Sequence, residues 1–427
     1  MKESIKKRIE SVRRGEVPEG YRRAKDIGIA PADWKVGQLS DVLHNEPRPV
    51  SKPNNPYWRL GIRSWAKGTF RAYVDDPTAV DMGELYVVRE NDLVVNITFA
   101  WEHAIAVASK EDDGLLVSHR FPTYVFDRGN VPAYYKAVVS QQYFKDMLDH
   151  ISPGGAGRNR VLNRKDFLAL PCYVPPVAEQ QKIAEILATC DRMIELKQSK
   201  IDELKKLKQV CLLEMFPQKG QTIPNRRFPG FSAPWEQRKV SDLAEKTYGG
   251  GTPTTSNEAY WNGDIPWIQS SDVVDGKLFG VEPRKRITQD GLNNSAAQLI
   301  PENSIAIITR VGVGKLAFMP FSYATSQDFL SLSRLNTEPL FTVYACYKKL
   351  QSELNAVQGT SIKGITKEEL LAKAIMVPQY AEQQQIGTFF SQLDHLITLH
   401  QRELAEVGKY KKTLMQLLLT GLVRVNA

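Results

Sequence analysis

The sequence predicts a chain of class α/β (α+β) in which a globular domain followed by a long helix occurs twice in tandem. The phrase PPVAEQQKI begins at Pro175 and returns as PQYAEQQQI at Pro378. Each phrase opens a long helical pattern, and similar landmarks precede each phrase in the same order. A single globular core has no need to repeat itself at this distance, so the repeat indicates two copies of one architectural unit.

The composition sets the first limits on function. With 427 residues, 42% hydrophobic and 24% charged, the chain is long enough for two globular domains. Its net charge of +8 suits an anionic partner such as nucleic acid. The start MKESIKKRIE lacks an apolar signal region and no run approaches a membrane span, so we expect a soluble, cytoplasmic protein. The four cysteines show no paired spacing, which argues against disulfides or structural zinc.

The order of elements follows from these landmarks. We predict a basic N-terminal arm at 1–30, a first globular domain at 31–176, a first long helix at 177–216, a linker at 217–231, a second globular domain at 232–379 and a second long helix at 380–421. The first 25 residues carry nine Lys/Arg against four acids, and the linker is rich in proline and basic residues.

The two domains share their landmarks in register. Trp34 precedes Ser40 as Trp235 precedes Ser241, and the strand-like runs NDLVV (91–95) and NSIAI (303–307) correspond. SHRF (118–121) corresponds to SQDF (326–329). A glycine-bearing loop and a helix start follow at 154–170 and at 358–374. There Thr366 and Glu369 form a capping box, of which Asn163 with Asp166 would be the weaker counterpart.

Both long helices carry an apolar seam with a 3.5-residue period, which is typical of a coiled coil. At 1.5 Å per residue each is about 57 Å long. The residues that we expect to form the helix pair or to dock a partner are Glu179, Gln180, Ile183, Leu187, Ile194, Ile201, Leu204, Glu382, Gln383, Ile386, Phe390, Ile397, Leu404 and Val407. Two unrelated amphipathic helices, each packed on its own domain, are the alternative.

Polar residues interrupt the two seams at equivalent places, Lys197 with His400 and Lys208 with Lys411. An antiparallel pairing would place Lys197 opposite Lys411 and Lys208 opposite His400, as polar layers that fix the register. Leucine at both Lys208 and Lys411 should then raise the melting temperature.

The regions between the landmarks differ between the halves and collect residues that read base edges or approach phosphates. The candidates in the first half are Arg59, Arg63, Lys67, Asn96, Thr98, His119, Arg158, Asn159 and Arg160. Those in the second half are Tyr248, Gly250, Gly251, Thr252, Gln269, Ser270, Thr309, Arg310, Lys315, Gln327, Ser361 and Lys363. Each residue alone is better explained by a solvated surface charge or a turn glycine, and the binding interpretation gains from the set as a whole, in matching places of two repeats. We expect Trp58, Trp65, Trp101, Trp261 and Trp267 to be core or loop-anchoring residues.

No catalytic motif accompanies these candidates. RVGVGKL (310–316) lacks the first glycine and the Ser/Thr of a phosphate-binding P-loop, and NNPY (54–57) lacks a proline of the adenine-methyltransferase loop. The six histidines form no zinc motif, and we find no hydrolase or nuclease pattern. We therefore predict a binding protein with no catalytic or metal-binding residues.

These motifs together resemble the specificity (S) subunit of type I restriction–modification systems. The paired AEQQ phrases with their helices carry the resemblance, together with RRFPGF (226–231), YGGGTP (248–253), WIQSSD (267–272) and GTSIKGITKEEL (359–370). The resemblance implies two target-recognition domains that each read one half of an asymmetric bipartite DNA target, and helices that set the spacer length. It also implies two modification (methyltransferase) subunits docked on the helices, and restriction/translocase subunits in the full complex. S-adenosylmethionine, ATP and magnesium would then sit on those partners. The first half lacks a YGGGTP counterpart, which fits two different half-sites.

Two other functions stay open at this point. A coiled-coil scaffold without sequence-specific DNA binding would use the helices as its binding surface. A methyltransferase or nuclease with a fused recognition region would need a cofactor motif, which a direct cofactor-binding assay would detect.

Overall fold

The computed structural model describes residues 3–24, 27–154, 160–356 and 364–425. The chain forms two compact units, unit 1 from 1–196 with 404–427, and unit 2 from 197–403. The two long helices are α5 (Val177–Glu214) and α9 (Tyr380–Leu419), and each contributes residues to both units. Each unit therefore holds one globular domain and a part of each long helix.

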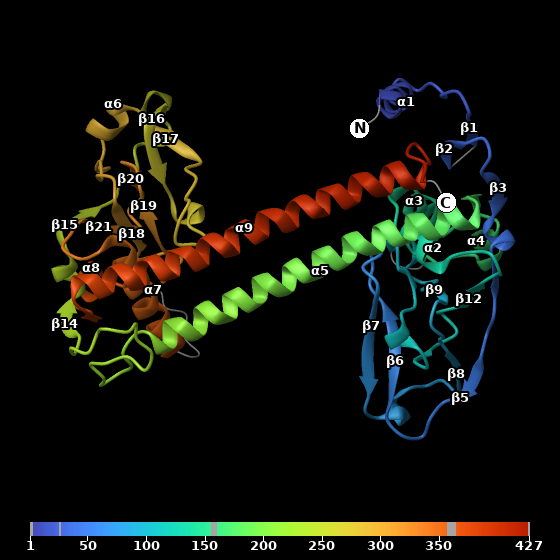
Figure 1. The fold of residues 1–427 in the computed structure, drawn as a ribbon, viewed down its shortest axis with the longest axis horizontal. Coiled ribbons are helices and arrows are strands. Elements are labelled where there is room, and N and C mark those ends of the chain that lie inside the picture. The colour runs from blue at the N-terminus through green and yellow to red at the C-terminus, as the bar shows by residue number, and fades with distance from the viewer. Residues whose placement is uncertain (1–2, 25–26, 155–159, 357–363, 426–427) are drawn as a thin grey trace. The chain divides into compact units, whose positions relative to one another are not determined.

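Unit 1 combines short helices with small sheets (Figure 1). Its helices besides the long ones are α1 (Glu3–Arg13), α2 (Pro132–Val139), α3 (Gln142–His150) and α4 (Arg164–Leu168). Its strands are β1 (Tyr21–Ala24), β2 (Gly28–Pro31), β3 (Lys35–Gln38), β4 (Leu43–Asn45), β5 (Pro49–Ser51), β6 (Tyr57–Ile62), β7 (Thr69–Val74), β8 (Glu84–Val87), β9 (Leu93–Val95), β10 (Ile105–Val107), β11 (Leu116–Val117), β12 (Thr123–Phe126) and β13 (Pro171–Val174). They pair in the orders β10-β9-β12-β4, β5-β8-β11-β6-β7, β13-β3 and β1-β2.

The core of unit 1 lies between its four-stranded sheet and its helices. Trp34, Tyr124 and Phe167 are almost fully buried there. The same cluster includes Ile183 near the start of α5 and Leu418 near the end of α9. In Figure 1, α2 and α3 lie beside these parts of the long helices. The seams of the helices are therefore part of the hydrophobic core that stabilises this unit.

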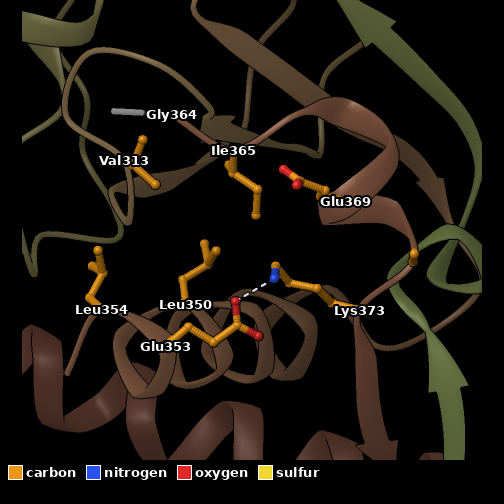
Figure 2. A pocket seen from close by; sticks show the side chains of 9 residues that line it. Val313, Leu350, Glu353, Leu354, Gly364, Ile365, Glu369 and Lys373 are labelled. Atoms are coloured by element: carbon orange, nitrogen blue, oxygen red, sulfur yellow. Dashed lines mark ion pairs between the residues drawn. The ribbon is translucent and has the colours of Figure 1, made fainter. Parts of the chain in front are cut away.

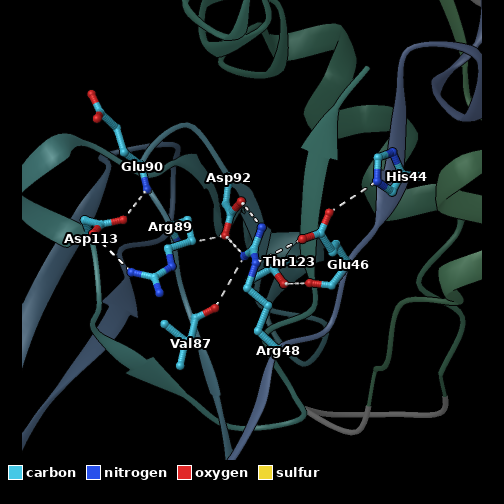
Figure 3. Close-up of polar contacts among 9 residues, drawn as sticks. All are labelled: His44, Glu46, Arg48, Val87, Arg89, Glu90, Asp92, Asp113 and Thr123. Atoms are coloured by element: carbon cyan, nitrogen blue, oxygen red, sulfur yellow. Dashed lines mark hydrogen bonds and ion pairs between the residues drawn. The ribbon is translucent and has the colours of Figure 1, made fainter. Parts of the chain in front are cut away.

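A buried ion pair joins the five-stranded sheet of unit 1 to β9. The Arg48 guanidinium donates to both carboxylate oxygens of Asp92, at 2.6 and 3.2 Å, and Asp92 is only 2% exposed (Figure 3). Asp92 also accepts a bond from the backbone N–H of Arg89. Because Arg48 precedes β5 and Asp92 precedes β9, this pair fixes the two sheets against each other.

Unit 2 contains a second set of the same elements. Its short helices are α6 (Gln289–Asn293) and α8 (Lys367–Leu371), and its longer helix is α7 (Pro339–Ala356). Its strands are β14 (Glu236–Lys239), β15 (Ala244–Gly249), β16 (Trp261–Ile268), β17 (Lys285–Ile287), β18 (Ser304–Ile308), β19 (Leu316–Met319), β20 (Ala324–Thr325), β21 (Phe329–Leu335) and β22 (Ala374–Val377). They pair in the orders β15-β21-β18-β19, β17-β16-β20 and β14-β22.

The topology confirms the predicted tandem repeat. The order β15-β21-β18-β19 of unit 2 is the order β4-β12-β9-β10 of unit 1. The parallel pair β16 with β20 in unit 2 has its counterpart in β6 with β11 of unit 1, and the antiparallel ribbon β14 with β22 has its counterpart in β3 with β13. Asn91 and Asn303, which precede equivalent strands, both adopt left-handed backbone (φ 68° and 59°), a conformation that asparagine tolerates better than most residues.

Most apolar positions of the two seams are buried, with Ile194, Leu404 and Val407 half-buried, but the register of the helices differs from the prediction. Lys208 Nζ lies 2.6 Å from Asp394, and Lys197 Nζ lies 2.7 Å from Glu403, not opposite His400 and Lys411. In unit 1, Lys411 forms an ion pair with Asp191. Early residues of α5 meet late residues of α9, so the pairing is antiparallel. Each lysine meets an acid beside the opposite seam, because pairing of opposite charges is more favourable than a layer of like charges.

The N-terminal arm is more ordered than its composition suggested. Strands β1 and β2 pair as an antiparallel ribbon, and Ala30 is fully buried in the unit 1 core. The Tyr21 hydroxyl donates to the Gly421 carbonyl, and the Tyr173 hydroxyl donates to the Gly28 carbonyl. Among the described residues, no helix has an apolar stretch long enough to cross a membrane.

Candidate nucleic-acid interface

The second-half candidates gather at one edge of the four-stranded sheet in unit 2. Strands β15 and β18 end at this edge, and strands β19 and β21 begin there, because neighbouring strands are antiparallel. Tyr248 lies near the end of β15, and the segments beyond the strand ends hold Gly250, Gly251, Thr252, Thr309, Arg310, Lys315 and Gln327. The parallel pairing of β16 with β20 brings Gln269 and Ser270 to the same edge. Ser361 and Lys363 lie outside the described residues.

Exposure separates these candidates into surface and supporting residues. Arg310 and Gln327 are exposed, and Lys315, Gln269, Ser270 and Tyr248 are half-buried. Gln327 Oε1 accepts a bond from the Thr252 hydroxyl at 2.8 Å, which fixes the amide at the surface. Thr309 is 3% exposed and its hydroxyl donates to the Asp328 carbonyl, so its side chain supports the loop from below.

The loop that carries Arg310 rests on helix α7. Gly314 has φ 95°, and a Cβ there would lie 2.2 Å from Leu354 Cδ1, so only glycine fits. Gln351 Nε2 donates to the Gly314 carbonyl at 3.2 Å. Under the loop is a pocket of about 490 Å³ lined by Val313, Leu350, Leu354 and Ile365, with an ion pair between Lys373 and Glu353 at one side (Figure 2). These contacts hold the Arg310 backbone on a rigid helix.

The two glycines expected to admit phosphates have a different role. A Cβ on Gly250 would lie 1.8 Å from the Ser326 carbonyl oxygen, and one on Gly251 would lie 2.2 Å from the Ala296 carbonyl carbon. The Gly251 N–H already donates to the Thr325 carbonyl at 2.8 Å. Close packing of the chain against itself explains both glycines, and the Gly251 N–H is already bonded within the chain.

Replacement of Gly250 with alanine should destabilise unit 2 by about 1–3 kcal/mol, because the added methyl group displaces the Ser326–Gln327 segment. Urea unfolding of the full chain measures this. The matched control is Gly408→Ala, an exposed helical position with nothing within 4 Å, which should stabilise by about 1 kcal/mol. Equal stability of the Gly250 variant and wild type would contradict the packing argument.

Five of the first-half candidates gather at the equivalent edge of unit 1, whereas Arg59 lies within β6. Strand β9 ends there and strands β10 and β12 begin there. Asn96 and Thr98 follow β9, and His119 precedes β12. The turn between β6 and β7 joins this edge, because the Trp65 N–H donates to the Glu102 carbonyl at 2.8 Å. This turn holds Arg63 and Lys67.

Three first-half candidates make hydrogen bonds within unit 1. Asn96 is 9% exposed and its Oδ1 accepts the Thr98 N–H. The Arg160 guanidinium donates to the carbonyls of Ser152 and Asp149, pairs with the Asp149 carboxylate and lies 5.3 Å from the Trp101 ring. Arg63 donates to the Thr69 carbonyl while remaining exposed. Arg59, Lys67 and His119 are exposed, and Arg158 and Asn159 lie outside the described residues.

Two of the five tryptophans are not core residues, contrary to the sequence interpretation. Trp58 is 51% exposed and Trp65 is 60% exposed. Trp267 is buried, and Trp101 and Trp261 are half-buried. Trp101 Nε1 donates to the Thr98 carbonyl, as expected of a loop-anchoring residue. No periodicity marks the other two as surface residues.

The glutamate and glutamine of each AEQQ phrase make equivalent contacts inside the chain. Gln180 accepts the Val131 N–H and donates to the Pro175 carbonyl, and Gln383 does the same with Glu338 and Pro378. All four glutamates and glutamines, Glu179, Gln180, Glu382 and Gln383, are at most 4% exposed. They therefore attach each helix to its own domain and present no surface to a partner.

Each buried glutamate forms an ion pair with an arginine that follows the other long helix in the sequence. Glu179 accepts bonds from Arg424 at 2.8 and 2.9 Å and from Trp34 Nε1 at 2.9 Å. Glu382 accepts two bonds of 2.7 Å from Arg227. The carboxylates of Glu179 and Asp33 raise the pKa of Arg424 above its ordinary value. The repeated sequence could have suggested Arg227 from its RRF motif, but Arg424 carries no comparable signal.

The described residues contain no cluster that could bind a metal ion, and two of their cysteines, Cys172 and Cys346, are buried. No group of three His, Cys, Asp or Glu side chains in this part of the chain could hold a metal ion. Burial raises the pKa of the Cys172 and Cys346 thiols to about 12, above the range of reactive cysteines.

A tandem pair of such domains, each built on the same sheet with different loops, defines a class of DNA-recognition protein. Residues 31–206 and 233–409 each match the family described as type I restriction modification DNA specificity domain. These segments cover most of both halves, so the chain belongs to that family.

Known proteins of similar length resemble this chain in sequence and in fold. The putative type I restriction enzyme MjaX specificity subunit of Methanocaldococcus jannaschii is 23% identical over 96% of this chain and 97% of its own. A solved chain of a type I R-M system, studied for its assembly and conformational transition, matches with a TM-score of 0.55 and 18% identity over 92% of this chain and 99% of its own. The type I restriction-modification S subunit of M. genitalium matches with a TM-score of 0.54 and 12% identity over 90% and 96%.

Proposed function

We propose that this chain is the DNA-recognition subunit of a type I restriction–modification complex, and that each unit reads one half of an asymmetric bipartite target. The observation that carries the proposal is the pair of equivalent sheet edges with different side chains. Topologically identical strands end at both edges, yet Arg63, Lys67 and His119 gather at one and Arg310, Lys315 and Gln327 at the other. Different donors and acceptors on the same scaffold would read different bases.

The exposed members of each set are the proposed contacts. In unit 1 they are Arg59, Arg63, Lys67 and His119, and in unit 2 they are Arg310 and Gln327, joined by the half-buried Gln269 and Lys315. The committed residues Arg160 and Thr309 would position loops without touching bases. This division follows the usual separation between rigid support and flexible, exposed readers.

The long helices would set the number of unread base pairs between the half-sites and dock two modification subunits. Each helix is unbroken, over 38 residues in α5 and 40 in α9. Apolar side chains on them are exposed, including Leu196, Leu213 and Tyr410 at 70%, 59% and 67%. Exposed apolar side chains are what partner docking would cover. Catalysis, S-adenosylmethionine, ATP and magnesium would then belong to the modification and restriction subunits.

The test of this function is a methylation map. The chain is expressed with its neighbouring modification subunit in a host without other DNA methylation, and methylated adenines are located across the genome. An asymmetric motif in two parts separated by a fixed spacer is the expected result. Methyl transfer by the chain alone would refute the proposal, as would a complex that binds all sequences equally.

Replacement of Arg310 with alanine should weaken binding by about 1–3 kcal/mol on targets with the intact unit 2 half-site, because a bidentate contact to a base edge is lost. Dissociation constants on the target and on single-base variants of each half-site measure this. The matched control is Arg238→Ala, an exposed arginine on β14 that pairs with Glu236. Equal weakening on every sequence would assign Arg310 to a phosphate contact instead.

A further inference from the structure

The turn between β6 and β7 presents a tryptophan in a backbone conformation that suits glycine. Trp65 has φ 65° and Ala66 has φ 49°, both in the left-handed region. The Trp65 side chain is nevertheless 60% exposed. A bulky residue rarely adopts this conformation, because its Cβ approaches the following carbonyl oxygen.

Hydrogen bonds from a second loop fix this conformation. The Trp65 N–H donates to the Glu102 carbonyl at 2.8 Å, and the Ala66 N–H donates to the His103 carbonyl at 2.9 Å. The Ser64 hydroxyl donates to the Glu102 carboxylate at 2.6 Å. Within the turn, the Arg63 N–H donates to the Gly68 carbonyl at 2.9 Å. The backbone is therefore held rigidly whichever side chain stands at position 65.

The indole itself contributes little to the fold of unit 1. Its Nε1 donates no hydrogen bond to any described residue, whereas those of Trp34, Trp101, Trp261 and Trp267 each do. The only ring contact it makes within the described residues is with Lys145, whose Nζ lies 4.8 Å from the ring centroid. That ammonium would orient the ring and place a positive charge beside it. Folding alone would be served as well by glycine.

The turn lies at the edge that carries the proposed DNA contacts of unit 1. Glu102 and His103 belong to the loop after β9, which also holds Thr98. In unit 2 the corresponding strand β16 is followed by the short 3-10 helix η7 (Ser270–Asp272) and not by a turn of this kind. Unit 2 therefore has no equivalent tryptophan. Any role of Trp65 would therefore concern one half-site only.

We propose that Trp65 is a specificity-determining residue whose indole stacks on a base of the half-site read by unit 1, while Lys145 contacts the adjacent phosphate. The proposal rests on the proposed function and adds a residue and a mode of contact to it. A rigid, exposed aromatic ring beside a cation is the combination that proteins use to stack on bases. To make such a contact, the protein must open the stack between two neighbouring base pairs. The free energy of this opening depends on the base-pair step, so the contact discriminates between sequences.

The test compares Trp65→Gly with wild type in the complex with the modification subunit. The duplex probes carry the bipartite motif from the methylation map. Glycine suits the left-handed turn, so this variant should melt at the same temperature as wild type or above it. It should nevertheless bind the target about 5- to 150-fold more weakly. Trp65→Phe should recover part of the affinity.

The matched control is Trp58→Ala. It removes an exposed ring on the same hairpin that packs on Tyr73, and it should bind like wild type.

A scan with abasic positions locates the contact. An abasic site at one position of the unit 1 half-site should weaken wild type and leave Trp65→Gly unchanged, since the variant has no ring to stack there. At all other positions the two proteins should lose affinity equally. Wild-type affinity for Trp65→Gly, or parallel losses at every position, would overturn the inference while leaving the proposed function intact. If the wild-type complex yields no bipartite motif, the proposed function fails and this inference fails with it.

Discussion

Replacement of Arg227 with methionine is expected to lower the melting temperature of unit 2 by about 6–20 °C. Arg227 Nε and Nη2 each lie 2.7 Å from a carboxylate oxygen of Glu382, whose side chain is fully buried. Methionine fills most of the same volume but leaves that carboxylate buried without its cation. Breaking one partner of a buried pair costs about 3–5 kcal/mol. Calorimetry of the full chain measures the shift.

The neighbouring arginine provides a control. Arg226 pairs with Glu214 at 2.8 Å, but its side chain is 61% exposed, so Arg226→Met should change the melting temperature little. In the Arg227→Met background, Glu382→Gln should recover much of the loss, because an amide carries no charge to bury. If the double variant melted no higher than Arg227→Met, the lost stability would have to come from the Ala233 carbonyl contact of Arg227.

The equivalent pair in unit 1 should be less sensitive. Arg424 is 35% exposed, and Glu179 keeps a hydrogen bond from Trp34 Nε1 when the arginine is removed. In unit 2 the corresponding indole, Trp235 Nε1, has no hydrogen-bond partner among the described residues. Among the described residues, Glu382 therefore accepts side-chain hydrogen bonds from Arg227 alone, whereas Glu179 accepts them from an arginine and from a tryptophan.

The sequence predicted the architecture because each of its signals is local and occurs twice. Strand-like runs at 91–95 and 303–307 became equivalent central strands, and the capping box at Thr366 and Glu369 formed as predicted. The equivalent placement of the candidate loops was predictable for the same reason, since loops that follow equivalent strands must meet at equivalent edges. At Asn163 the cap is made to the Lys165 N–H alone.

The roles of individual residues were harder to predict because they depend on distant contacts. The AEQQ phrase was read as a possible docking surface, but Glu179 and Glu382 are buried by arginines that follow the opposite helices. The exposure of individual side chains was also not predictable from the sequence. Asn96 and Thr309 are buried, whereas Trp58 and Trp65 are exposed. No local pattern distinguishes a polar residue that supports a loop from one that faces solvent.

The observed helix register reverses the sign of one sequence-based prediction. Lys208 was expected to form a layer with His400, so leucine at Lys208 and Lys411 was expected to raise the melting temperature. The Lys208 ammonium instead lies 2.6 Å from Asp394, with side chains only 10% and 18% exposed. Asp394 also accepts the Tyr344 hydroxyl at 2.7 Å. The seam pattern could not show this, because Asp394 lies beside the seam and was not counted in it.

Replacement of Lys208 with leucine is therefore expected to lower the melting temperature of unit 2 by about 6–12 °C. The loss corresponds to about 3 kcal/mol, at the lower end for a broken buried pair, because Asp394 keeps the bond from Tyr344. Adding Lys411→Leu should change little further, since its partner Asp191 is 48% exposed.

A second substitution separates loss of the charge pair from poor packing of leucine. Asp394→Asn in the Lys208→Leu background removes the unpaired charge and keeps an oxygen that can accept the Tyr344 hydroxyl. This double variant should recover most of the lost stability, with an interaction energy that a double-mutant cycle measures directly. Lys197→Leu is the matched control, because its pair with Glu403 is more exposed and should matter little. A rise in melting temperature for Lys208→Leu alone would mean that the seam gains more from an apolar side chain than from the ion pair, as the sequence pattern first suggested.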